Sequence, residues 1–339
     1  MLIILLTNWQ KTFNHSNSTH WHIFFIVKLN LFRQERRMKI NLVYGNHWNF
    51  GIGVGDTFRY LSLAISQAGY DVITSREPVI NRINIYLENF DTDYVAKLKQ
   101  LKHAGGQYII IATEFLTGDT FNDFEKTLDI SYYSDREYWK KRYQAFSALV
   151  NDATAIWHFS DLAATDYEKQ LDRTVGYVPH HYVKNFATVQ HRSDAQKDID
   201  FLFTGSITNY RKKILQGLSN LNFKIEISSS LTAPFHRDDL IARSKFCLNI
   251  PQFKQWPYPS QSRYFYHLIN RSPIITPALP YKSDLEEYTL ESTVSILEYC
   301  QALYEQANYT QLANNTFHQF KRDTNASIAL ASLLKKVKL

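Results

Sequence analysis

The sequence predicts two α/β domains, each built on a mainly parallel β-sheet. From Met38 onward, short apolar runs rich in strand-forming residues alternate with stretches of helical periodicity. The alternation stops at Pro179, residues 180–197 are polar and irregular, and the alternation resumes at Ile199. The length of 339 residues is also enough for two domains that each bury a core of their own.

The elements of the first half follow from its apolar patterning. Strands are expected at 40–44, 72–74, 83–87, 108–112, 155–158 and 175–178. Helices are expected at 57–68, 93–104, 138–151 and 161–171. The first helix comes after a long glycine-containing loop, 45–55, and its periodicity places Phe58, Leu61 and Ile65 on one face. The run 108–112 is almost wholly apolar, which is typical of a strand covered on both faces.

The second half repeats the same kind of pattern. Strands are expected at 201–204, 223–227, 246–250 and 273–276. Helices are expected at 210–218, 238–244 and 261–270, and three terminal helices at 295–306, 309–320 and 327–336. We therefore divide the chain into an N-terminal Rossmann-like domain at 38–185, a linker at 186–197 and a C-terminal Rossmann-like domain at 198–339.

Residues 1–37 are expected to be a non-native or disordered extension. The apolar run Met1–Leu6 is much shorter than the roughly 20 residues of a membrane span. It lacks the charged start and small-residue cleavage site of a signal peptide. Met38 opens a run that is typical of a first strand, and a purine-rich sequence can encode the preceding Glu35-Arg36-Arg37. The segment therefore has the features of a misplaced gene start.

Charge and cysteine content narrow the classes of function. The net charge is +6, but residues 1–37 hold five basic residues against one acidic residue, so the remainder is near neutrality. A nucleic-acid partner is therefore not expected. Cys247 and Cys300 have neither metal-site spacing nor a disulfide framework, and Cys247 lies in an apolar run. Buried, reduced thiols indicate the cytoplasm.

Four short runs in the second half carry a resemblance to a known family. They are Asp198–Ser206 (DIDFLFTGS), Arg211–Leu215 (RKKIL), Ile241–Pro251 (IARSKFCLNIP), and Pro259–Arg263 (PSQSR) ahead of a strand at 273–276. Their order and spacing resemble the C-terminal domain of GT-B glycosyltransferases, especially spore-maturation-like and group 1-type bacterial members. The resemblance covers about residues 198–288, while the first half matches only in its layout.

The resemblance implies a nucleotide-sugar donor bound in a cleft, mostly against the C-terminal domain. A diphosphate requires backbone N–H groups at a helix start and nearby cations. The residues implied for donor binding are Gly205, Ser206, Arg211, Lys212, Pro251, Ser260, Ser262 and Arg263. Arg211 and Lys212 are equally compatible with a solvated helix face. Many retaining members carry a glutamate pair near this last helix, but residues 260–270 contain no acidic residue, so the stereochemistry stays open.

The resemblance also places an acceptor and a catalytic base on the N-terminal domain. A group whose pKa lies near the working pH suits the role of base. His47 and Asp56 are candidates, because they flank the glycines at 51–55. Glu114 follows the apolar strand, so it is a further catalytic candidate. Gly53 and His180 are the remaining candidates for the acceptor side of the cleft. As alternatives, Asp56 caps a helix starting at residue 57, and Glu114 is a capping or solvated residue.

The expected activity is transfer of a hexose-like sugar to a glycan or lipid-linked acceptor, without metal or cofactor. This predicts a cytoplasmic bacterial protein of polysaccharide biosynthesis, with peripheral contact to the inner membrane face allowed. Asp91-Thr-Asp93 has the form of a metal-binding Asp-X-Asp motif, but three residues are a weak signal and the cap of the helix after Asp93 is the favoured interpretation. Two other functions stay open. One is a non-catalytic nucleotide- or glycan-binding protein of the same fold. The other is an NAD-dependent oxidoreductase, suggested by glycines at 51, 53 and 55.

Overall fold

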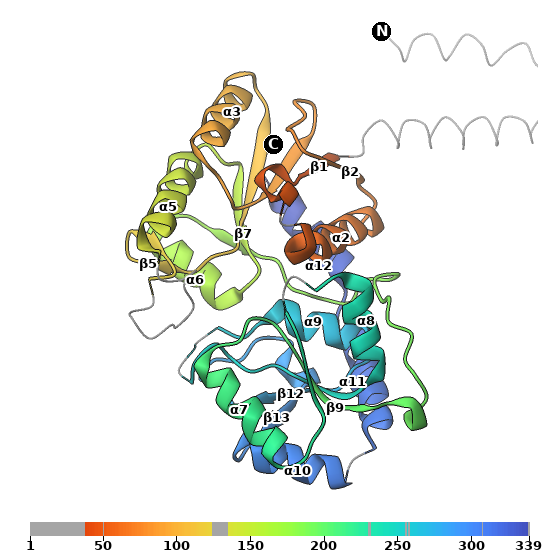
Figure 1. The fold of residues 1–339 in the computed structure, drawn as a ribbon. Helices are drawn as coiled ribbons and strands as arrows, with labels where there is room; N and C mark the ends of the chain where they lie inside the picture. Colours follow the sequence, from red (N-terminus) through yellow and green to blue (C-terminus); the bar gives the residue numbers. More distant parts are fainter. Residues whose placement is uncertain are drawn as a thin grey trace, which may run out of the picture. The chain divides into compact units, whose positions relative to one another are not determined.

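Two parallel β-sheets with helices packed on them form the protein (Figure 1). The computed structural model describes residues 38–49, 51–123, 135–229, 232–254, 256, 258–306 and 308–337. The prediction for residues 1–37 lies outside these residues. The two sheets are formed by successive halves of the chain, which confirms the predicted α/β fold class with two Rossmann-like units.

The first sheet has the strand order β2-β1-β3-β4-β7-β8, and all its pairings are parallel. Its strands are β1 (Lys39–Val43), β2 (Asp71–Ser75), β3 (Ile83–Leu87), β4 (Gln107–Ala112), β7 (Ala155–His158) and β8 (Val175–Tyr177). Its helices are the 3-10 helix η1 (Gly45–Asn49), α2 (Gly51–Gln67), α3 (Thr92–His103), α5 (Arg136–Val150) and α6 (Asp161–Leu171). A short hairpin, β5 (Leu116–Thr117) and β6 (Thr120–Phe121), follows β4.

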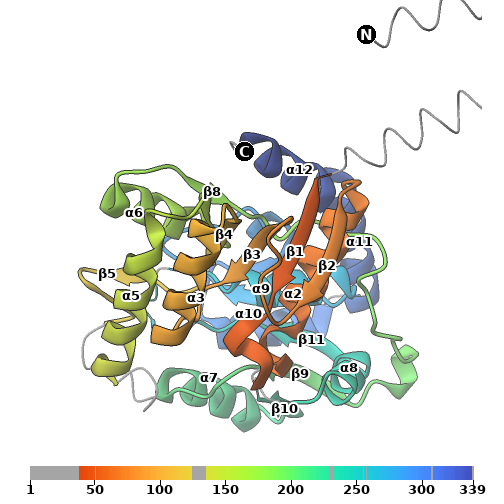
Figure 2. The same cartoon turned by 90° about the horizontal axis from the view of Figure 1, so that it is seen from above.

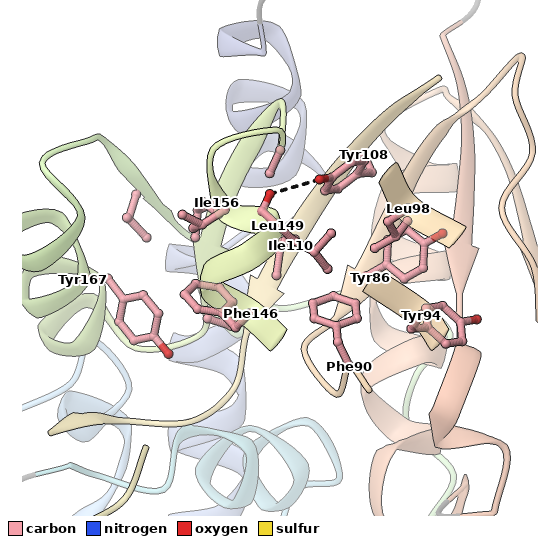
Figure 3. Close-up of a cluster of buried hydrophobic side chains, with 14 of the residues drawn as sticks. Tyr86, Phe90, Tyr94, Leu98, Tyr108, Ile110, Phe146, Leu149, Ile156 and Tyr167 are labelled. Carbon is pink, nitrogen blue, oxygen red and sulfur yellow. Dashed lines mark hydrogen bonds between the residues drawn. The ribbon is translucent and has the colours of Figure 1, made fainter. Parts of the chain in front are cut away.

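Aromatic side chains fill the core between this sheet and helices α3, α5 and α6 (Figure 3). Tyr86, Tyr108 and Phe146 are fully buried in this cluster. The Tyr108 hydroxyl donates to the Leu149 carbonyl at 3.0 Å, so its polar atom has a partner inside the core. This packing fixes the carboxyl ends of β3 and β4, where the polar side chains described below begin.

The second sheet has the order β10-β9-β11-β12-β13, again with parallel pairings. Its strands are β9 (Ile199–Thr204), β10 (Ile225–Ser228), β11 (Ser244–Leu248), β12 (Ile274–Pro277) and β13 (Leu290–Ser292). The helices of this half are η3 (Asp194–Gln196), α7 (Asn209–Asn220), α8 (Pro234–Arg243), α9 (Gln261–Ile269), η4 (Glu286–Tyr288), α10 (Ile296–Gln306), α11 (Tyr309–Asp323) and α12 (Ala326–Lys336).

The last helix returns to the first half of the chain. Helix α12 packs against α2 (Figures 1 and 2), and Leu333 reaches the space that a side chain on Gly176 of β8 would occupy. The Ala326 amide donates to the Tyr182 carbonyl at 2.9 Å. The chain therefore crosses from one half of the molecule to the other twice, once after β8 and once before α12. The domain boundaries drawn from the sequence stay predictions.

The predicted loop at 45–55 is wrong. The structure has η1 at Gly45–Asn49 and starts α2 at Gly51, although glycine costs about 1 kcal/mol in a helix. The buried face of α2, with Tyr60, Leu61 and Ile65, compensates through packing. Asp56 is consequently inside the helix, and the alternative that it caps a helix at residue 57 is also wrong.

The Asp91-Thr-Asp93 run forms a helix cap. The Asp91 carboxylate accepts from the Tyr94 amide at 2.9 Å, and α3 begins at Thr92. The capping interpretation is therefore confirmed, with the helix starting one residue before Asp93. Across the described parts of the chain, no group of three or more His, Cys, Asp or Glu side chains is arranged to hold a metal ion.

Candidate functional site

Two adjoining cavities lie between the sheets at the carboxyl ends of their strands. The larger has a volume of about 810 Å³ and the smaller about 220 Å³. Gly205, Ser260 and Arg263 line both cavities, and each cavity is also lined by residues of the first half of the chain. This is where ligands bind in open α/β folds. We refer to the two cavities together as the cleft.

Gly205 forms the turn after β9. Its φ of +140° is open to glycine alone, and its amide donates to the Ser228 carbonyl at 2.8 Å. A Cβ at this position would lie 2.7 Å from Nη2 of Arg263. Glycine is therefore needed here for two reasons, the backbone conformation and the close approach of the Arg263 guanidinium.

Arg263 is held by neutral groups. Its Nε donates to the Thr204 carbonyl at 2.7 Å, and its Nη1 donates to Oδ1 of Asn249 at 2.5 Å. Burial, together with the neighbouring Arg211, lowers the pKa of the Arg263 guanidinium to about 9. No carboxylate pairs with this side chain among the described residues. A largely buried cation without a counterion is suited to receive an anionic ligand.

Arg211 is a second buried cation of the cleft. It lies in the first turn of α7, where Thr208 caps the helix, and only 4% of the residue is exposed. Its Nε donates to the Ile250 carbonyl at 2.9 Å, and its Nη1 donates to the Ser206 carbonyl at 2.8 Å. The solvated alternative is therefore wrong for Arg211. Lys212 is exposed and lines neither cavity.

The other residues implied for donor binding are divided between the cavities. Ser206 and Pro251 line the larger cavity, and Ser262 lines the smaller. Ser260 is the N-cap residue of α9 and lines both, and its hydroxyl makes no capping hydrogen bond. Gly205, Ser206, Arg211, Pro251, Ser260, Ser262 and Arg263 are thus brought together around the cleft, and Lys212 is not.

Asp56 contributes to an ion pair across the smaller cavity. Its Oδ2 accepts from Nη1 of Arg237 in α8 at 2.7 Å, so the pair joins α2 to the second half of the chain. The Arg237 guanidinium stacks 3.8 Å from the ring centre of Tyr266. Because this ion pair engages the Asp56 carboxylate, Asp56 is positioned to hold the two halves together as well as to line the cavity.

His180 also lines the smaller cavity. It stacks on Tyr60 with ring centroids 5.4 Å apart, and burial lowers its pKa to about 4. The ring is therefore neutral near neutral pH. Its neighbour His181 instead approaches Asp284 at 3.4 Å, so the two adjacent histidines do point to different surroundings.

His47 and Glu114 line the larger cavity from the first sheet. Burial, and then the charge of Arg142, lower the pKa of His47, which keeps the imidazole neutral near neutral pH. Among the described residues, Nε2 of His47 has no hydrogen-bond partner. Glu114 has partners for both carboxylate oxygens, Arg142 at 3.1 Å and Asn122 at 2.7 Å. Gly53 lies in the first turn of α2, and its surroundings lie outside the description.

A buried charge network supports Glu114. Arg142 of α5 forms ion pairs with both Glu114 and Glu88, and Glu88 is completely buried at the end of β3. Burial raises the pKa of Glu88 to about 7, against the opposing effect of Arg142. Four further residues at the cleft are not among those predicted from the sequence: Glu88, Arg142, Asn249 and Arg237. Glu88 and Asn249 directly follow apolar strands, which is a signal that could have found them, whereas nothing in the helical patterns marks the two arginines.

The topology of two parallel sheets with a cleft at their carboxyl ends is that of the GT-B fold. None of the helices in the described ranges combines the length and apolar character required to cross a membrane. No protein-family model and no curated protein sequence matches the chain.

Several solved structures are similar to this one. T4 phage β-glucosyltransferase has 12% sequence identity and a TM-score of 0.47, covering 89% of this chain and 100% of that chain. A glycosyltransferase from Rickettsia africae has 9% identity and a TM-score of 0.47, covering 88% and 97%. S. aureus MnaA with UDP has 10% identity and a TM-score of 0.46, covering 88% and 95%.

Proposed function

We propose that the protein is a glycosyltransferase that uses a nucleoside diphosphate sugar as its donor. The observation that carries the proposal is Arg263. Its guanidinium lies in the cleft, packs on the Gly205 turn and has no carboxylate partner among the described residues. A diphosphate would supply the missing negative charge.

The donor would lie against the second sheet. Arg263 would contact the diphosphate, and the start of α9 would add the positive end of a helix dipole. These groups would stabilise the leaving nucleoside diphosphate, which a preorganised positive site does without moving at the moment of reaction. In this proposal the diphosphate needs no metal ion, because Arg263 and the helix start supply the positive charge.

The acceptor would lie against the first sheet, in the larger cavity. His47 is the better placed general base, because its imidazole is neutral and its Nε2 has no other partner among the described residues. It would remove the proton from the acceptor hydroxyl as the oxygen attacks the anomeric carbon. Glu114 is held by Arg142 and Asn122, so its proposed role is to line the acceptor site. Asp56, the other candidate base, is engaged by Arg237.

The size of the larger cavity supports a sugar donor with a glycan or lipid-linked acceptor. Its volume of about 810 Å³ lies in the range of small-molecule sites, which are lined mostly by apolar and aromatic groups. Phe115, Trp256 and Tyr258 supply such a wall, with Phe115 and Tyr258 stacked at 3.8 Å. We propose a hexose-like sugar on this basis. The buried free thiols of Cys247 and Cys300 support a cytoplasmic site of action.

A thermal-shift screen tests the donor class. The full chain is heated with UDP, GDP, ADP, CDP or dTDP, and with NAD as a comparator. A nucleotide present at 100 times its Kd adds about 2.7 kcal/mol to stability, so at least one diphosphate should raise the Tm. A shift with NAD and none with the five diphosphates would overturn the proposal in favour of an oxidoreductase.

Catalysis is tested with the sugar nucleotides of whichever base binds. We expect release of the nucleoside diphosphate from at least one sugar donor, faster with a suitable acceptor. Arg322→Met should leave this activity unchanged, because Arg322 is an exposed arginine paired with Asp323 and lies outside the cleft. Binding without release or transfer from any donor would instead indicate a non-catalytic nucleotide-binding protein.

A further inference from the structure

A third cavity lies away from the cleft. It has a volume of about 430 Å³ and shares no lining residue with the other two. Its walls are the segment 182–191, which connects the two sheets, the end of α9 and the face of α11. The volume falls in the range of small-molecule sites and exceeds what a bare ion requires.

Two positive charges line this cavity. The Arg271 guanidinium lies 4.5 Å from the ring centre of Phe317, and the Lys321 ammonium lies 5.6 Å from that of Tyr182. Within the described chain, neither cation has a carboxylate partner, and no acidic residue lines the cavity. His191 adds no charge near neutral pH, because burial lowers its pKa against the opposing effect of the 2.6 Å hydrogen bond from its Nε2 to the Asn270 carbonyl.

The backbone of Arg271 is held in a conformation that favours glycine. Its φ is +55°, directly after the Asn270 cap of α9, where glycine is the usual residue. An arginine there stores strain, and strained residues that persist are concentrated at functional sites. The conformation sets the guanidinium over Phe317 at the cavity wall.

Apolar and neutral polar side chains form the rest of the wall. Val183, Ile269 and Phe317 are buried and Val189 is half-buried, and Asn185, Asn270 and His191 also line the cavity. We propose that this cavity binds a phosphate ester that carries an apolar group. Arg271 and Lys321 bind the phosphate through charge-assisted hydrogen bonds, and the apolar side chains contact the remainder of the ligand.

Calorimetric titration of the full chain with dihexanoyl phosphatidate, below its micelle concentration, tests the site. We expect saturable binding that Arg271→Gly and Lys321→Met each weaken at least about tenfold, as loss of a charge-assisted contact implies. Arg271→Gly should at the same time leave the Tm unchanged or raise it, because glycine relieves the backbone strain. A drop in binding without loss of stability separates a ligand role from a structural one.

Matched variants control for charge and for backbone. Asn222→Gly also introduces glycine at a residue with left-handed backbone, since Asn222 has a φ of +64° just after α7. This variant should leave binding unchanged. Arg322→Met removes a neighbouring charge that Asp323 already pairs. Arg271→Gly should bind nucleoside diphosphates normally, so this site and the proposed donor site are tested separately.

The probes also identify the source of the ligand. Glycerol 3-phosphate represents the phosphate ester without an apolar group and should bind more weakly than dihexanoyl phosphatidate, and phosphatidylcholine vesicles containing phosphatidate represent a lipid surface. Arg271-dependent cosedimentation with the vesicles would assign a lipid, and its absence alongside saturable binding of the short-chain probe would assign a soluble ester. The proposal is overturned if the parent protein does not bind dihexanoyl phosphatidate. Equal binding of dihexanoyl phosphatidylcholine or of inorganic phosphate, or undiminished binding by Arg271→Gly, would overturn it as well.

Discussion

Replacing Arg263 with methionine separates the charge of this side chain from the space that it fills. Nε and Nη1 are already engaged by Thr204 and Asn249, whereas Nη2 has no hydrogen-bond partner among the described residues. We therefore assign one charge-assisted hydrogen bond to the diphosphate, worth about 1.5–3 kcal/mol. Since each 1.4 kcal/mol of binding free energy changes Kd tenfold, the Kd for UDP or GDP should rise roughly 10- to 150-fold.

The stability of the ligand-free protein should change much less. The substitution leaves the Thr204 carbonyl and the Asn249 side chain without a donor, but it also removes a buried charge that has no counterion in the described chain. These effects oppose each other, so we expect the free energy of unfolding to change by about 1 kcal/mol or less. Lys would be a poor replacement, because it cannot reproduce the planar fork of donors.

Calorimetry with UDP and GDP, and urea unfolding of the same samples, provide the two measurements. Arg322→Met serves as the control for loss of one positive charge at an exposed position. The reasoning is refuted if folded Arg263→Met binds both nucleotides with a Kd within about twofold of the parent. It is also refuted if Arg322→Met weakens binding as strongly as Arg263→Met does.

Three further substitutions test other parts of the cleft. His47→Gln should lower kcat by about 10²–10⁴ with little change in nucleotide affinity, and an unchanged kcat would exclude His47 as the base. His180→Phe should reduce the loss of unfolding free energy that occurs as the pH falls. The pKa of His180 is about 4 in the fold against 6.5 unfolded, so the unfolded state binds the proton first. Stability is thus lost as pH falls from about 6.5 to 4, and the variant should recover about 3 kcal/mol of it in urea titrations across that window. Gly205→Ala should cost about 1–3 kcal/mol through its φ of +140° and displace the Arg263 guanidinium, so unchanged nucleotide binding would contradict the close packing seen here.

The side of the cleft to which we assign the donor could be predicted from local sequence. A strand, a Gly205 turn and a helix start follow directly from an apolar run, a glycine and a helical period. Ser260 and Arg263 likewise stand at a recognisable helix start. Each of these features depends on residues that are close in sequence, where patterning carries the most information.

The rest of the cleft depends on contacts between distant segments. Arg142 lies inside a helix whose pattern shows only an amphipathic face, yet it pairs with Glu88 and Glu114, which come from two strands. The pairing of Asp56 with Arg237 joins opposite halves of the chain. The start of α2 was mispredicted for the related reason that tertiary packing outweighs the low helix propensity of its glycines.

The return of α12 to α2 has a consequence for how the chain folds during synthesis. Helix α2 ends at Gln67, but the helix that covers it begins only at Ala326. At about 5–20 residues per second, a ribosome needs roughly 15–50 s to make the intervening chain. The part of the α2 surface that contacts α12 therefore stays uncovered while the entire second sheet is made. A chain cut short within its last dozen residues would leave the defect on α2, far from the truncation in sequence.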